Sequence, residues 1–191
     1  MGLRLLSRLF CASIIGVATL ASAADIRPSY RPFDVKSGNR QFTARVFVAD
    51  KQGADQPWQW RYRIQVVSTR DQTVQWEHDY LYNGHPGGEL SDDGLYFVDA
   101  SSWYRDSGQL VSIHHAQGHH HFSAADLRVS PDGLEGTNSH RRWLQDVQFV
   151  NGEAGTARFL LETVQGARCI ALKPEISVEH PCATDERMLR H

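Results

Sequence analysis

The sequence lacks the short motifs that mark common enzyme classes. It contains no G-x-S-x-G nucleophile elbow, no H-E-x-x-H zinc motif, no Gly-rich phosphate loop and no paired metal carboxylates. Asp92 and Asp93 are adjacent, but they lie in a turn-forming stretch, where such residues more often serve the turn than an acid/base reaction. These absences predict a protein that is not an enzyme and that needs no cofactor.

Long runs of one charge are also absent. The chain has 20 basic and 22 acidic residues, and its formal net charge is −2. Proteins that bind nucleic acid or anionic membranes usually concentrate positive charge on one segment or face. The composition therefore argues against both kinds of partner.

The first 23 residues have the organisation of a secretory signal peptide. Arg4 and Arg8 supply the positive region, residues 9–20 are apolar, and Ala21–Ala23 forms an A-x-A cleavage site. The apolar run is shorter than the roughly 20 residues that span a bilayer, which argues against a membrane anchor. We expect export to the periplasm or beyond, with a single domain formed by residues 24–191.

Cysteine is scarce, with three residues in the whole chain. Cys11 would leave with the signal peptide, so Cys169 and Cys182 would remain as a pair in an oxidising compartment. We predict a disulfide between them, which would contribute about 3 kcal/mol by closing the intervening loop. The alternative, a catalytic or metal-binding thiol pair, would prefer closer spacing such as C-x-x-C.

No window shows a sustained apolar period of 3.6 residues, so little helix is expected. Residues 58–66 instead alternate apolar and polar side chains, the pattern of a half-buried strand. Residues 24–40, which contain two prolines, are predicted to be extended. Further strands are predicted at residues 41–50, 73–81, 95–98, 109–115, 143–150, 156–163 and 167–172.

These strands fall into three groups of about 30 to 40 residues, residues 41–81, 90–129 and 143–172. The spacing is typical of propeller blades, but three groups are too few to close a propeller. We therefore predict an all-β fold of antiparallel sheets, propeller-like or a sandwich.

A loop between two of the predicted strands combines aromatic, charged and small polar residues. Such a loop, held at both ends by strands, is a plausible contact surface for another protein. Its members are Ser101, Ser102, Trp103, Tyr104, Arg105, Asp106, Ser107 and Gly108.

Histidines are concentrated in residues 114–121. If residues 116–118 form a three-residue hairpin turn, His115 faces His119 and His114 faces His120. One face would then offer three imidazoles to Zn²⁺, Cu²⁺ or Ni²⁺: His115, His119 and His121. The alternatives are a solvated hairpin without a physiological metal and a surface that changes charge near pH 6.

The stretch Leu90–Phe122 resembles a group of small exported bacterial all-β proteins in which an S-D-D-G turn precedes a hydrophobic strand. Here the turn is Ser91–Gly94, and Trp103 and Trp143 suit the same pattern. The strand and the hairpin that follow look like one blade of a propeller.

A small exported β protein with a Ser-Gly loop is also similar to the periplasmic immunity proteins that neutralise peptidoglycan amidase effectors of type VI secretion. In that family a loop Ser enters the effector's active-site groove and hydrogen-bonds its catalytic residues. The resemblance implies this role for Ser107, which precedes Gly108, with Ser101 and Ser102 as alternatives.

We therefore expect a non-enzymatic periplasmic binding protein, an inhibitor of the immunity type. Its partner would be a secreted peptidoglycan hydrolase or another periplasmic protein. The interface would bury about 1,600 Å² in total, with Trp103, Tyr104 or Arg105 as anchors. An exported metal-binding protein is the main alternative, and an exported hydrolase with an unrecognised site is a third.

Overall fold

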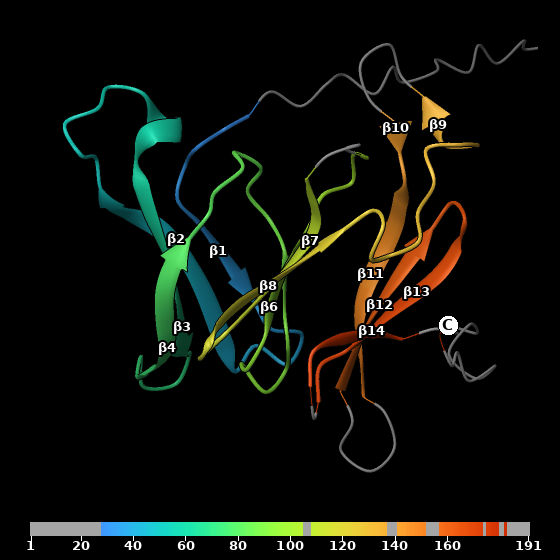
Figure 1. The fold of residues 1–191 in the computed structure, drawn as a ribbon. Helices are drawn as coiled ribbons and strands as arrows, with labels where there is room; N and C mark the ends of the chain where they lie inside the picture. The colour runs from blue at the N-terminus through green and yellow to red at the C-terminus, as the bar shows by residue number, and fades with distance from the viewer. Residues whose placement is uncertain are drawn as a thin grey trace, which may run out of the picture.

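Three four-stranded antiparallel sheets form the body of the protein (Figure 1). The structure is a computed structural model and describes residues 28–104, 108–136, 141–151, 157–173, 175–179 and 182. The predicted signal peptide, residues 1–23, lies outside these residues. Within each sheet the strands follow one another in chain order, so neighbouring strands are joined by hairpins or short loops. The predicted all-β class and the three strand groups are confirmed.

The N-terminal sheet comprises β1 (Phe33–Lys36), β2 (Phe42–Asp50), β3 (Arg61–Ser68) and β4 (Val74–Tyr80). The central sheet comprises β5 (Glu89–Leu90), β6 (Phe97–Ala100), β7 (Gln109–His115) and β8 (Gly118–Ser123). The C-terminal sheet comprises β11 (Leu144–Asn151), β12 (Ala157–Thr163), β13 (Gly166–Ala171) and β14 (Ser177–Glu179). A short ladder of β9 (Glu135–Gly136) and β10 (Arg141–Arg142) leads into the C-terminal sheet.

The central sheet lies between the other two and packs against both (Figure 1). Successive side chains of a strand point to opposite faces of the sheet. Phe97 therefore belongs to the core shared with the N-terminal sheet, and Val98 to the core shared with the C-terminal sheet. The second core also contains Ile113, Phe159 and Leu161, each fully buried. Burying such a side chain contributes about 1.5–3 kcal/mol, so both faces of the central sheet stabilise the fold.

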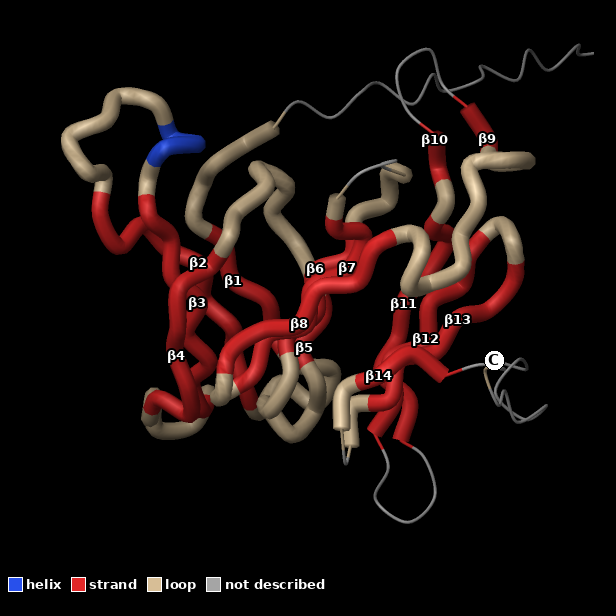
Figure 2. The backbone as a smooth tube through the Cα atoms, in the orientation of Figure 1, coloured by secondary structure: helices blue, strands red, loops and turns tan. Residues whose placement is uncertain are grey.

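The strand predicted from Trp58 starts later than expected. Pro57 fixes a backbone angle suited to a helical turn, and the chain forms the 3-10 turn η1 (Pro57–Gln59) before β3 begins (Figure 2). Trp58 is consequently 61% exposed, whereas Tyr62, Ile64 and Val66 occupy the buried face as predicted. Among the described residues, η1 is the only helical element. This part of the chain contains no helix that is long and apolar enough to cross a membrane.

The S-D-D-G turn forms as predicted and joins two sheets. The Gly94 amide donates to the Ser91 carbonyl at 2.9 Å, and Gly94 has a φ of +71°. A side chain there would place its Cβ 2.6 Å from the Phe42 ring of the N-terminal sheet, so glycine allows the two sheets to approach. The Trp76 indole Nε1 then donates to the Gly94 carbonyl at 2.8 Å.

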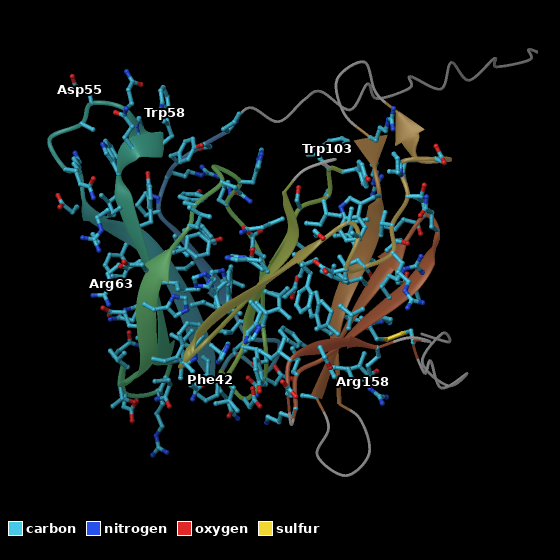
Figure 3. All side chains as sticks on the ribbon, viewed as in Figure 1. Phe42, Asp55, Trp58, Arg63, Trp103 and Arg158 are labelled. Carbon is cyan, nitrogen blue, oxygen red and sulfur yellow. A yellow bond between two sulfur atoms is a disulfide. The ribbon has the colours of Figure 1, made fainter. Side chains whose placement is uncertain are left out.

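The predicted disulfide between Cys169 and Cys182 is present (Figure 3). Cys169 lies in β13, and the two Cα atoms are 5.1 Å apart. The bond ties the chain beyond β14 back to the C-terminal sheet.

Candidate functional site

The predicted contact loop runs from the end of β6 to the start of β7, and its first half is fixed by backbone hydrogen bonds. Trp103 forms an antiparallel bridge with Arg142 of β10, and the Tyr104 amide donates to the Arg141 carbonyl at 2.7 Å. On the other side, the Ser101 amide donates to the Leu110 carbonyl of β7 at 2.8 Å. The loop therefore connects the central sheet with β10, next to which Trp103 lies in Figure 3.

Burial divides the predicted contact residues into two kinds. Ser102 and Gly108 are exposed, whereas Tyr104 is half-buried and packs against the core between the central and C-terminal sheets. Tyr104 therefore contributes to the protein's own packing, and little of it is left for a partner. Ser101 and Trp103 are also half-buried, and the last three predicted contact residues lie outside the described residues: Arg105, Asp106 and Ser107.

Two neighbouring hollows of about 260 and 250 Å³ open beside this loop. Both are lined by Asn83, Asp99 and Ser101, and together they are called the Asp99 groove below. The Asp99 carboxylate accepts hydrogen bonds from Asn83 Nδ2 at 3.2 Å and from the Tyr80 hydroxyl at 3.4 Å. Burial raises the pKa of Tyr80 well above its ordinary value, and Asp99 acts in the same direction. Tyr80 therefore remains a neutral donor that positions the Asp99 carboxylate in the lining of the groove.

The turn carboxylates of Asp92 and Asp93 are occupied by structural hydrogen bonds. Asp92 Oδ1 accepts from the Asn39 backbone N–H at 2.7 Å, which ties the turn to the N-terminal sheet. Asp93 Oδ1 accepts from Ser91 Oγ at 2.7 Å, and its second oxygen lies 3.3 Å from Lys173 Nζ. Asp93 therefore stabilises the turn itself, as predicted, whereas Asp92 joins the turn to the N-terminal sheet, which was not predicted.

The histidine-rich hairpin has a different register from the one predicted. Its turn contains two residues, Ala116 and Gln117, because Gly118 belongs to β8 and pairs with His115. His114 consequently pairs with His119, and a shift of one residue moves every following side chain to the opposite face. The prediction that His115, His119 and His121 share a face was wrong, since His115 lies on the opposite face from the other two.

The observed register brings together histidines from two sheets. His114 and His119 face the N-terminal sheet, where the ring of His78 in β4 stacks on His114 with centroids 5.2 Å apart. His78, His114 and His119, called the histidine cluster below, each have a ring nitrogen within 4.8 Å of the others. His121 lies beside the cluster, its ring 4.4 Å from that of His119, and its Nδ1 is hydrogen-bonded to Ser112 Oγ at 3.0 Å.

The cluster is buried on one side and open on the other. His114 is 2% exposed, His78 is half-buried and His119 is exposed. Burial lowers the pKa of His114 to about 3, and the neighbouring imidazoles act in the same direction. Burial also lowers the pKa of His78, against the opposing effect of its hydrogen bond to the Asp79 carbonyl. Both rings are therefore neutral at physiological pH, and each keeps one nitrogen with a free lone pair.

His78 was not singled out from the sequence, although a local signal existed. Trp76, His78 and Tyr80 follow one another at every second position, and the first and last of these are buried. That period of two places His78 on the inner face of β4. Its contact with a hairpin of another sheet depends on how the sheets pack, which no local pattern reports.

No protein-family model matches the chain, and no curated protein or solved structure matches it either. The resemblance to type VI immunity proteins therefore stays a prediction.

Proposed function

We propose that this protein is a non-enzymatic exported binding protein, an immunity-type inhibitor that blocks the active site of a cell-wall hydrolase with the loop Ser101–Gly108. The attachment of the first half of this loop supports the proposal most. Because residues 101–104 are hydrogen-bonded both to β7 and to β10, they lose little conformational entropy when a partner binds.

The Asp99 groove adds a surface that a partner can fill. It lies beside the loop and presents carboxylate, amide and hydroxyl groups together with the half-buried Trp103. Polar groups around an aromatic residue are typical of protein interfaces. A partner that contacts Ser102 on the loop would also reach the groove, because Ser102 lines it.

The test uses the protein without its signal peptide and a panel of purified peptidoglycan amidases acting on purified cell-wall sacculi. We expect near-equimolar protein to inhibit at least one amidase. Ser102→Arg adds bulk at an exposed position of the loop and should weaken that inhibition by more than about tenfold. A Ser107→Arg, Trp103→Ala double variant should abolish it.

Ala116→Arg is the matched control, because Ala116 is exposed at the turn that ends β7, away from the loop that precedes the strand. Thermal unfolding of every variant separates lost contact from lost fold. The proposal is wrong if no amidase is inhibited, or if the loop variants inhibit as well as the wild type does.

A further inference from the structure

The contact between the N-terminal and central sheets contains an arrangement that the inhibitor function does not use. The histidine cluster takes His78 from β4, His114 from β7 and His119 from β8, strands that lie side by side where the hairpin of β7 and β8 reaches β4 (Figure 1). These residues are separated by up to 41 positions in the sequence, yet their ring nitrogens lie within 4.8 Å of one another. Ordinary aromatic packing does not require three ring nitrogens to lie this close together.

The hydrogen bonding of His78 identifies the ring nitrogen that keeps a lone pair for a metal. Its Nδ1 lies 2.7 Å from the Asp79 carbonyl oxygen, which can only accept, so Nδ1 carries the proton and Nε2 the lone pair. A backbone carbonyl that holds one ring nitrogen in this way is the usual support of a metal-binding histidine.

Two nitrogens of the cluster are buried without a hydrogen-bond partner, His78 Nε2 and His114 Nδ1. Leaving a buried polar atom unsatisfied costs about 1–3 kcal/mol, and native proteins rarely tolerate it twice at one place. A bound cation would satisfy a lone pair on both atoms at once.

We propose that His78, His114 and His119 bind one Zn²⁺ ion at the interface of the N-terminal and central sheets. Neutral imidazoles are ordinary zinc ligands, with a nitrogen-to-metal distance of about 2.1 Å. Around a tetrahedral ion the ligand nitrogens would be about 3.4 Å apart, so the cluster has to contract slightly. The exposed side chain of His119 can make that movement. Among the described residues this group has only three members, because no ligand atom of His121 belongs to it, which leaves the fourth position to water or to a partner's side chain.

The test uses untagged protein without its signal peptide, stripped with EDTA and then titrated with ZnCl₂ by calorimetry. We expect one Zn²⁺ per chain and a rise in Tm on binding. Co²⁺, used as a spectroscopic probe, should give the intense visible absorption of a tetrahedral site. His119→Gln should weaken Zn²⁺ binding by more than about tenfold, since even outer groups around a metal site change affinity that much. His78→Gln should also weaken Zn²⁺ binding.

The hairpin supplies its own control. His120 is as exposed as His119 but lies on the opposite face, so His120→Gln should leave the affinity unchanged. His119 and His120 are both at the surface, and neither variant is expected to unfold the protein. Absence of Zn²⁺ binding would overturn the site. Equal losses in the two variants would also overturn it, because they would indicate adventitious binding to a histidine-rich surface.

Discussion

The two faces of the central sheet are packed by different chemistry. Toward the C-terminal sheet its residues belong to a mostly aliphatic core, called the aliphatic core below, which contains Val98, Ile113 and Leu161. Toward the N-terminal sheet the same strands present Phe97 and His114 to a layer of rings that carry polar atoms. The rings of that layer are Tyr62, Trp76, His78, Tyr80 and Tyr82.

The difference concerns how polar atoms are satisfied. Most of the ring hydroxyl and indole groups in the aromatic layer have backbone partners, such as the Tyr82 hydroxyl, which donates to the Ser29 and Arg31 carbonyls at 2.9 Å. The buried nitrogens His78 Nε2 and His114 Nδ1 have no hydrogen-bond partner. The aliphatic face therefore stabilises the fold, while the aromatic face combines stability with groups available for binding.

The largest effect is expected in the aliphatic core. Phe159→Ala leaves a cavity at a fully buried position and should lower the free energy of unfolding by about 3–5 kcal/mol, measured by urea denaturation. Zn²⁺ affinity measured at low temperature, where the variant is still folded, should stay the same. A parallel loss of Zn²⁺ affinity would mean that the two faces do not act independently.

The disulfide belongs to the same half of the molecule. Cys169 and Cys182 are 13 positions apart, and the cross-link should contribute about 3 kcal/mol by restricting the unfolded chain. A Cys169→Ala, Cys182→Ala variant should lose this amount in denaturant titrations. Unchanged Zn²⁺ binding in the variant would again show that the two halves of the molecule act independently.

The aromatic face should make stability depend on pH. The pKa of His114 is about 3 in the folded protein and about 6.5 when unfolded, so protonation favours the unfolded state. The contribution of His114 to the free energy of unfolding should be present above pH 6.5 and be lost as the pH drops toward 3. At pH 5 the loss should be about 2 kcal/mol. The titratable groups around His114 are His78 and Tyr80 of β4, His115 of β7, and His119 and His121 of β8.

Urea denaturation at pH 7 and pH 5, with EDTA present, measures this loss. His114→Phe keeps a ring of similar size and removes the titration, so it should lose about 2 kcal/mol less than the wild type over the same interval. His78 remains in the variant, and burial lowers its pKa as well. The variant should therefore still lose some stability as the pH falls. Equal losses in the two proteins would show that His114 is not the responsible group.

Side-chain alternation was enough to place most strands. Residues 109–115 form a strand with the predicted bounds, and Tyr62, Ile64 and Val66 occupy the predicted face. The strand predicted at residues 95–98 instead spans Phe97–Ala100, and two further errors lie where one residue decides the outcome. Pro57 delays β3, and the inclusion of Gly118 in β8 reverses the faces of the hairpin histidines.

Local sequence alone accounts for the all-β class, the S-D-D-G turn and the pairing of Cys169 with Cys182, because each depends on short-range periodicity, turn chemistry or the small number of cysteines. The histidine cluster depends on the packing of one sheet on another, which brings β4 against the hairpin of β7 and β8. Such contacts are decided by the three-dimensional fit of whole sheets, so the partner of His114 became apparent only in the folded molecule.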